Sequence, residues 1–211
     1  MSSETKSSYP TGLIPVVTID DYRSVSQLVR VLADSGATAI EITLRTSSAF
    51  QALEAAIDEG ALSVGVGTVT SIESLRRSVE AGADFAVSPG FRADIVAEAG
   101  RLGILAIPGV ATATEVMMAA ASDVNLLKFF PAGAAGGAAA LRSLAEVFPD
   151  IQFMPTGGIG AEDLREYLSI KSVVAVGASW LAPRAMIAEQ RFGEIGATYS
   201  RALASVADLV S

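Results

Sequence analysis

The chain has 211 residues, of which 51% are hydrophobic, so it is long enough to bury the core of one domain. It contains no cysteine and no histidine, which excludes disulfides, thiolate nucleophiles and the commonest metal ligands. The formal net charge of −8 disfavours nucleic acid as a partner, because nucleic-acid binding needs a basic surface.

The N-terminal segment is rich in serine and threonine and lacks the basic start and apolar core of a secretory signal. We therefore predict a flexible tail over residues 1–10, one domain over residues 11–211 and a cytoplasmic location. No apolar run reaches the roughly 18 residues that a membrane helix needs, so we expect no contact with a membrane.

Short apolar segments rich in β-branched residues alternate along the chain with amphipathic segments rich in Ala, Leu, Glu and Arg. This alternation is typical of repeated βα units and predicts a parallel sheet. Gly36, Gly60, Gly82 and Gly100 stand where helices are expected to end, since glycine suits the left-handed residue that closes a helix. The predicted strands span residues 13–19, 37–44, 63–69, 85–88, 104–107, 126–130, 152–155 and 172–176.

Repeated units of about 25 residues each predict a compact α/β fold, a single (β/α)8 TIM barrel. An open doubly wound sheet is the alternative. Its dinucleotide-binding form would place a Gly-x-Gly-x-x-Gly turn after the first strand. The chain instead continues there as Thr18-Ile19-Asp20-Asp21, which favours the barrel.

Charged side chains interrupt the predicted strand 37–44. Strand alternation points Glu41, Thr43 and Arg45 to one face and the aliphatic residues to the other. In a barrel the aliphatic face meets the helices, so Glu41 and Arg45 would face the interior, with Arg45 nearest the catalytic carboxyl end. An ion pair between them that merely neutralises both charges is the alternative interpretation.

Glycines occur at the ends of three later strands. The segment 65–69, Gly-Val-Gly-Thr-Val, is weak evidence for a phosphate loop, and its usable group is the hydroxyl of Thr68. The segments 154–159 and 176–180 follow the last two strands, where barrels commonly bind phosphate through backbone N–H groups. Tight turns with no ligand are the alternative.

Lys128 is the one lysine within an apolar strand, in the segment Leu-Leu-Lys-Phe-Phe-Pro. Burying an ammonium group costs several kcal/mol unless it is paired, and burial favours the neutral amine that attacks carbonyl groups. A structural ion pair between lysine and glutamate would also account for it. The charges predicted on the interior face of a second strand favour a reactive lysine.

Taken together, six segments resemble the family of 2-keto-3-deoxy-6-phosphogluconate (KDPG) and 4-hydroxy-2-oxoglutarate (KHG) aldolases. Their order and spacing match that family over nearly the whole chain. The resemblance implies a class I aldolase on a (β/α)8 barrel, usually a homotrimer, that cleaves the phosphorylated keto acid to pyruvate and glyceraldehyde 3-phosphate. It implies no metal and no other cofactor. The segments are Glu41–Thr46, Val66–Val69, Ser88–Gly90, Lys128–Ala132, Pro155–Ile159 and Gly177–Trp180.

The resemblance also implies a role for individual residues. Lys128 would form the Schiff base with the C2 carbonyl, and Glu41 would be the general acid and base. Arg45, assisted by Thr68, would bind the substrate carboxylate. The other implied contacts are Pro89 and Phe130 at the pyruvate end, Thr156 at the substrate hydroxyls, and Gly157, Gly158 and Ser179 at the phosphate.

Three alternatives share this fold. The first is an aldolase with the same mechanism for 2-keto-3-deoxy-6-phosphogalactonate or for unphosphorylated 4-hydroxy-2-oxoglutarate. The second is a non-catalytic barrel that binds a sugar-acid phosphate. The third is a metal-dependent aldolase or a phosphate-binding epimerase, since fold alone does not determine chemistry. The absence of histidine disfavours metal assistance.

Overall fold

The computed structural model describes residues 9–210, so the predicted tail lies outside it except for Tyr9 and Pro10. Short strands alternate with helices along this range, as the sequence predicts. The strands are β1 Gly12–Val17, β2 Ala39–Thr43, β3 Ser63–Gly67, β4 Phe85–Val87, β5 Leu105–Ile107, β6 Gly109–Val110, β7 Leu126–Phe129, β8 Gln152–Phe153 and β9 Ala175–Ala178. The helices are α1 Val25–Asp34, α2 Ala49–Glu59, α3 Ile72–Ala81, α4 Ala93–Leu102, α5 Ala113–Ala120, α6 Gly137–Val147, α7 Leu164–Leu168, α8 Arg184–Ala188 and α9 Phe192–Ser205, with 3-10 turns η1 Tyr22–Ser24 and η2 Ser179–Leu181.

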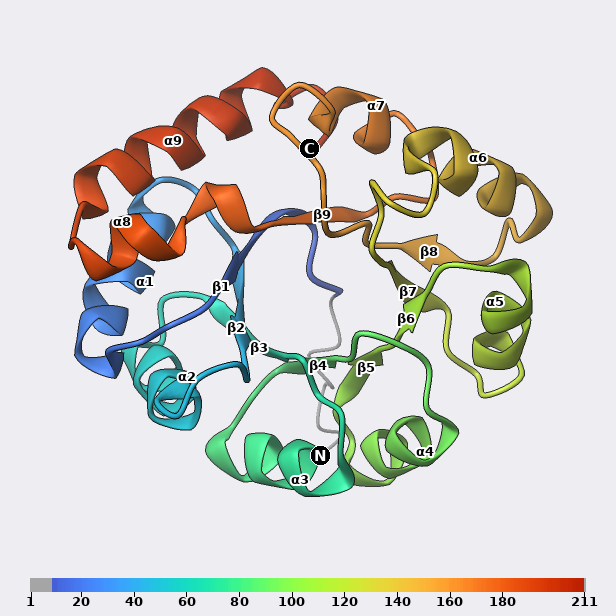
Figure 1. Ribbon diagram of the computed structural model, residues 1–211, viewed down its shortest axis with the longest axis horizontal. Helices are drawn as coiled ribbons and strands as arrows, with labels where there is room; N and C mark the ends of the chain where they lie inside the picture. The colour runs from blue at the N-terminus through green and yellow to red at the C-terminus, as the bar shows by residue number, and fades with distance from the viewer. Residues whose placement is uncertain (1–8, 211) are drawn as a thin grey trace, which may run out of the picture.

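All strand pairs are parallel, which confirms the α/β fold. A curved six-stranded sheet has the order β5-β4-β3-β2-β1-β9, and a three-stranded sheet has the order β6-β7-β8. Figure 1 shows the helices in a ring around these strands. Strands β1 to β5 lie side by side in chain order, without the reversal that defines a doubly wound sheet, so that alternative is wrong.

Backbone contacts connect the two sheets at both of their edges. Between β8 and β9, isolated bridges pair Phe153 with Val173 and Thr156 with Gly177. Between β5 and β6 the chain itself is continuous, with only Pro108 separating the two strands. The two sheets therefore adjoin each other at these edges.

The ends of several strands differ from the prediction for local reasons. The strand predicted over residues 104–107 is β5, and a second short strand, β6, follows after Pro108. Pro108 separates the two strands because it has no N–H to continue the ladder. Strand β3 ends before Thr68, whose φ of 64° departs from extended geometry. Strand β9 lies later than predicted, because its pairing with β1 extends to Ala178.

Side chains cap the N-termini of two helices, α5 and α3. Thr112 and Glu115 form a capping box at the start of α5, and the side chain of Ser71 caps α3. The prediction that a helix ends at Gly100 is wrong. Helix α4 continues to Leu102, and Gly103 is the left-handed residue that closes it.

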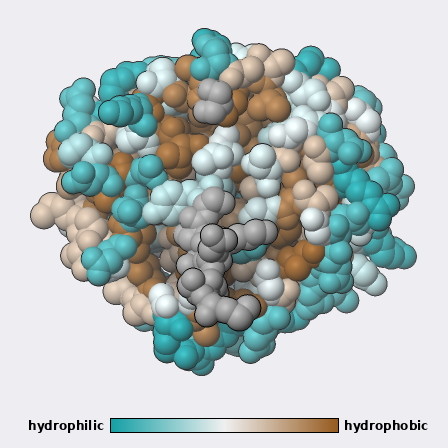
Figure 2. Space-filling model, turned by 180° about the vertical axis from the view of Figure 1, so that it is seen from behind, coloured by the Kyte–Doolittle hydropathy of each residue, from teal (hydrophilic) through white to brown (hydrophobic). Residues whose placement is uncertain are grey.

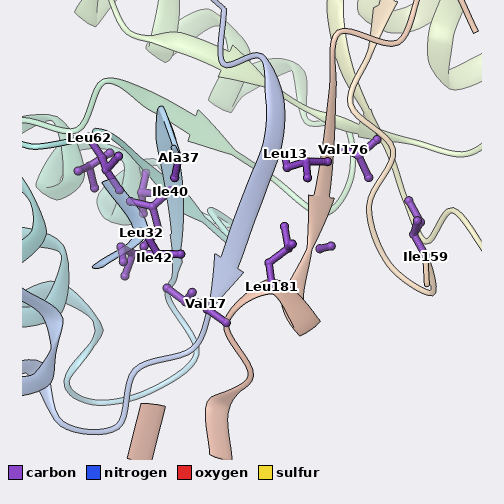
Figure 3. Packing of buried hydrophobic residues seen from close by; sticks show 14 of the residues in the cluster. Leu13, Val17, Leu32, Ala37, Ile40, Ile42, Leu62, Ile159, Val176 and Leu181 are labelled. Atoms are coloured by element: carbon purple, nitrogen blue, oxygen red, sulfur yellow. The ribbon is translucent and has the colours of Figure 1, made fainter. Parts of the chain in front are cut away.

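In several strands, neighbouring residues belong to two different apolar clusters. Residues such as Ile40 and Ile42 pack outward against the helices, and Figure 3 shows them beside Leu32 of α1. Their neighbours on the other face form a smaller inner cluster. These apolar side chains fill one part of the interior, and buried polar side chains such as Glu41 and Lys128 occupy another part. The inner cluster contains Ile14, Ala39, Phe85, Val87, Ile107, Leu126, Met154 and Ala175.

The outer surface mixes hydrophilic and hydrophobic residues, as Figure 2 shows for one face. Large apolar side chains that are exposed include Met117 and Met118 on α5 and Val147 on α6. Within residues 9–210, no helix has both the length and the apolar character needed to cross a membrane.

Candidate active site

Two charged residues, one from each sheet, meet in the interior of the protein. Lys128 on β7 is 5% exposed and Glu41 on β2 is 1% exposed. The Nζ atom of Lys128 donates a hydrogen bond to Glu41 Oε1 across 3.3 Å. This contact agrees with the predicted inward orientation of both residues. It agrees equally with the alternative interpretation, a structural ion pair between lysine and glutamate. The pairing offsets the cost of burying either charge alone.

One carboxylate oxygen of this pair has no hydrogen bond. Glu41 Oε2 is buried and has no hydrogen-bond partner among the described residues. Buried polar atoms in native proteins are almost always paired, so such an atom indicates a place for water or a substrate group. Lys128 Nζ also lies 5.2 Å from the centre of the Phe130 ring, within cation–π range.

An arginine lies at the carboxyl end of β2. Arg45 is exposed, and its Nε donates a hydrogen bond to Thr68 Oγ1 across 3.3 Å. Thr68 adopts a φ of 64°, which is rare for a β-branched residue and costs on the order of 1–3 kcal/mol. Such strain is typical of functional sites, and here it accompanies the contact between the hydroxyl and the guanidinium group.

Lys128 and Arg45 line one cavity of about 100 Å³. Most of the residues predicted to contact substrate line it as well, whereas Glu41 and Thr68 adjoin it through their hydrogen bonds. Pro89 is exposed in the loop after β4 and does not line it. The lining residues are Val16, Arg45, Lys128, Phe130, Thr156, Gly157, Gly158, Ile159, Gly177, Ala178 and Ser179.

Four of these lining residues, Val16, Ile159, Gly177 and Ala178, were not predicted as individual contacts, although the last three belong to the segments predicted to bind phosphate. Val16 and Ile159 are apolar, so composition gives no sign that they face a cavity rather than the core. The alternation of β1 does carry a signal for Val16, because Ile14 two residues earlier belongs to the inner cluster.

Glycines shape the wall near Thr156. Gly157 and Gly158 adopt φ angles of 91° and 72°, which other residues rarely adopt. A Cβ atom at Gly177 would lie 2.5 Å from Thr156 Oγ1, so only glycine leaves room for that hydroxyl. The backbone can therefore approach a ligand closely at this end of the cavity.

A larger cavity of about 480 Å³ lies elsewhere, near the C-terminal ends of α6 and α7. Its lining carries Arg142, Glu146 and Lys171 and shares no residue with the lining of the Lys128 cavity. Over residues 9–210, no cluster of three or more acidic side chains could hold a metal ion. The buried amine of Lys128, in contact with the Glu41 carboxylate, is suited to covalent chemistry.

Parallel strands that present a buried amine beside a carboxylate are suited to reactions at a carbonyl carbon, so the fold and the site define a carbonyl-processing α/β enzyme. Residues 7–198 match the family model of KDPG and KHG aldolase. The chain belongs to this family, which confirms the resemblance predicted from its motifs.

Individual relatives agree with the family assignment. A 2-dehydro-3-deoxy-phosphogluconate aldolase of Treponema pallidum is 38% identical over 90% of this chain and 91% of its own length. A crystal structure of KDPG aldolase from Legionella pneumophila, with pyruvate captured as a covalent carbinolamine, has a TM-score of 0.88 at 36% identity, covering 92% of this chain and 94% of that one. The enzyme from Zymomonas mobilis with 3-phosphoglycerate has a TM-score of 0.84 at 35% identity, covering 92% and 91%. The chain is thus a carbon–carbon lyase.

Proposed function

We propose that this enzyme is a class I aldolase that cleaves 2-keto-3-deoxy-6-phosphogluconate to pyruvate and glyceraldehyde 3-phosphate. The observation that carries the proposal is the buried Lys128 amine, 3.3 Å from Glu41 Oε1 and lining a cavity with Arg45. The carbinolamine formed by pyruvate in the Legionella pneumophila enzyme supports an amine nucleophile in this family.

The reaction begins when the neutral amine of Lys128 attacks the C2 carbonyl carbon of the keto acid. The carbinolamine loses water and leaves a protonated imine, which is the electron sink. A base removes the proton from the C4 hydroxyl, the bond between C3 and C4 breaks, and its electrons form an enamine. Glyceraldehyde 3-phosphate then leaves as the aldehyde, and the three-carbon enamine stays on Lys128.

Glu41 moves the protons in this sequence. As a carboxylate it accepts a proton, and as a carboxylic acid it returns one to the enamine carbon. The unpartnered Oε2 atom supports this role, because it can receive a substrate proton directly or through one water. Water then hydrolyses the pyruvyl imine, which releases pyruvate and regenerates the amine of Lys128.

Arg45 and Thr68 would bind the keto-acid carboxylate. A guanidinium group recognises a carboxylate through two parallel hydrogen bonds, and Thr68 already contacts Arg45 Nε. Phe130 would wall the pyruvate end, with Pro89 contributing from the loop after β4 once substrate is bound. Thr156, buried in the same lining, would meet the substrate hydroxyls.

The phosphate group would lie against the turns after β8 and β9. Gly157 and Gly158 let the backbone approach an anion, and Ser179 adds a hydroxyl. The 3-phosphoglycerate bound by the Zymomonas mobilis enzyme supports a phosphorylated ligand. The family name supports cleavage of 4-hydroxy-2-oxoglutarate to pyruvate and glyoxylate as a second activity.

The proposed architecture is one (β/α)8 barrel domain that begins at residue 11. The bridges from β8 to β9 would close it on one side, and β5 and β6 would form a single strand interrupted at Pro108. In this arrangement Lys128 and Glu41 face each other across the barrel interior, near the carboxyl ends of their strands.

A homotrimer in the cytoplasm completes the proposal. The exposed side chains of Met117, Met118 and Val147 are 62%, 51% and 67% accessible, so apolar surface is available for subunit contacts. A phosphorylated keto acid does not cross membranes unaided, which favours the compartment where it is made. Light scattering on the purified protein would measure the assembly directly.

The decisive experiment measures pyruvate release from the phosphorylated gluconate, the phosphorylated galactonate and 4-hydroxy-2-oxoglutarate. The proposal expects the highest kcat/KM with the gluconate, and a higher value with the galactonate would favour that rival.

Borohydride added with pyruvate should attach a reduced pyruvyl group to Lys128, and absence of this adduct would favour a non-catalytic binding protein. Activity should survive EDTA, because the imine replaces a metal as electron sink. Loss that added metal restores would favour the metal-dependent rival.

A further inference from the structure

Strand β3 has glycine at two successive positions of the face that points inward, Gly65 and Gly67. Val64 and Val66, between and beside them, belong to the outer apolar cluster. Strand alternation therefore directs any side chain at 65 or 67 into the interior. The two glycines leave space for different neighbours: the Phe85 ring at Gly65 and the Glu41 carboxylate at Gly67.

The space at Gly67 is filled by the carboxylate of Glu41. A Cβ atom built on Gly67 would lie 2.1 Å from Glu41 Oε1 and 2.8 Å from both Cδ and Cγ. Ordinary contacts begin at 3.4 Å, so the carboxylate would have to retreat by more than an ångström to admit a methyl group. At Gly65, by contrast, the added atom would meet the Phe85 ring at 2.0 Å.

Hydrogen bonds alone do not hold the carboxylate in place. Among the described residues, Oε1 accepts one hydrogen bond, from Lys128 across 3.3 Å, and Oε2 accepts none. The distance is slightly beyond the usual range of about 2.7–3.2 Å. The side chain of Glu41 has three rotatable bonds, so the space around it also decides where its carboxylate can lie. The absence of a side chain at 67 is the feature that admits it beside Lys128.

We infer that Gly67 is a positioning residue for proton transfer, acting through Glu41. The inference rests on the proposed function, in which Glu41 exchanges a proton with the carbon that becomes the pyruvate methyl group. Misplacement of a reacting group by about 1 Å can cost on the order of 100-fold in rate. A methyl group at position 67 should therefore slow proton transfer while the amine of Lys128 stays able to form its imine.

The test uses Gly67→Ala in the full chain, with two readouts on pyruvate. Borohydride trapping at long incubation measures imine formation, and proton NMR in deuterium oxide measures exchange of the methyl hydrogens. We expect wild-type trapping and exchange slowed by about 100-fold. Gly65→Ala is the matched control: it crowds the rigid ring of Phe85, so it should lower stability, yet its exchange per folded molecule should match the wild type.

A double-mutant cycle separates positioning from general damage. The side chain in Glu41→Asp is one carbon shorter and leaves room for the new methyl group. Adding Gly67→Ala to that variant should therefore cost little further exchange and little further stability, in contrast to its effect beside Glu41. Wild-type exchange rates in Gly67→Ala, or equal losses in both backgrounds, would overturn the inference. A wild-type enzyme that neither forms the imine nor exchanges would overturn the proposed function, and the inference with it.

Discussion

Lys128 and Glu41 are 87 positions apart in sequence, yet Lys128 Nζ lies 3.3 Å from Glu41 Oε1. The contact connects the two sheets, because Glu41 belongs to β2 of the six-stranded sheet and Lys128 to β7 of the three-stranded sheet. Both side chains are buried, so each depends on the other for compensation of its charge. The proposed nucleophile is thus also part of what holds the interior together.

Replacing Lys128 with methionine should abolish both cleavage and borohydride trapping, because methionine has no amine to form the imine. It should also lower the free energy of unfolding by about 3–5 kcal/mol, since removing one partner leaves a buried charge uncompensated. Urea unfolding followed by circular dichroism measures the stability loss, and the pyruvate adduct is measured by mass spectrometry.

The double variant Lys128→Met/Glu41→Gln is the control for the stability part. With both charges removed, most of the lost stability should return although activity should not. A double variant as unstable as Lys128→Met alone would contradict the ion-pair argument. Retained trapping in either variant would identify another amine as the nucleophile.

Arg45→Lys keeps the positive charge but loses the planar fork that binds a carboxylate through two hydrogen bonds. A charge-assisted hydrogen bond contributes about 1.5–3 kcal/mol, so KM for the keto acid should rise about 10- to 100-fold. Steady-state kinetics should show a smaller change in kcat. Arg23→Lys, an exposed arginine paired with Asp21, is the control and should leave KM unchanged. An unchanged KM in Arg45→Lys would remove this arginine from substrate binding.

Strand alternation made part of this site predictable from sequence. On β2 it assigns Glu41 and Arg45 to the interior face, and Ile40 and Ile42 do pack outward in the structure. On β7 it gives Lys128 the same orientation as Leu126, which belongs to the inner cluster. A charged residue at a position whose strand neighbours are buried is a strong signal, because burial of an unpaired charge is costly.

Other features depend on contacts between distant segments, which no local pattern encodes. The left-handed backbone of Thr68 runs against the preference of a β-branched residue, so local propensity predicts extended geometry there. The use of Gly67 becomes visible only when Glu41 from the neighbouring strand is in place. The break between β5 and β6 is predictable from sequence, because proline interrupts strand pairing at residue 108. No sequence feature predicts that pairing resumes at Gly109.

Gly158 and Gly103 form a matched pair for testing the phosphate site. Their φ angles are 72° and 73°, so alanine at either position should cost a similar amount of stability, about 1–2 kcal/mol. Gly158 lines the Lys128 cavity, whereas Gly103 follows α4 with nothing near its missing side chain. Only Gly158→Ala should impair activity, by disturbing the backbone that faces the phosphate.

The measurement is kcat/KM with a phosphorylated and an unphosphorylated substrate. We expect Gly158→Ala to lower the value for the phosphorylated substrate about tenfold, equivalent to one weakened charge-assisted hydrogen bond. The value for 4-hydroxy-2-oxoglutarate should change much less. Equal losses on both substrates would argue that Gly158 shapes the cavity without contacting phosphate.

Tyr199 on α9 connects the last helix to the first strand. Its hydroxyl donates a hydrogen bond to the carbonyl oxygen of Leu13 across 2.9 Å, and burial raises its pKa to about 12. An unfolded tyrosine has a pKa of about 10, so between about pH 10 and 12 the unfolded chain loses this proton while the folded protein keeps it. Stability should fall with rising pH in that window, by up to about 1.4 kcal/mol per pH unit from this group.

Tyr199→Phe should cost about 1 kcal/mol at neutral pH through the lost hydrogen bond. It should also unfold with a shallower dependence on pH between about 10 and 12, because phenylalanine cannot release a proton into the unfolded state. Urea midpoints across that range, compared between variant and wild type, isolate this group from the lysines and other tyrosines. Tyr22→Phe, at an exposed position, is the control. Parallel curves for Tyr199→Phe and the wild type would mean that the folded protein admits the tyrosinate, and that α9 is docked against β1 by apolar packing alone.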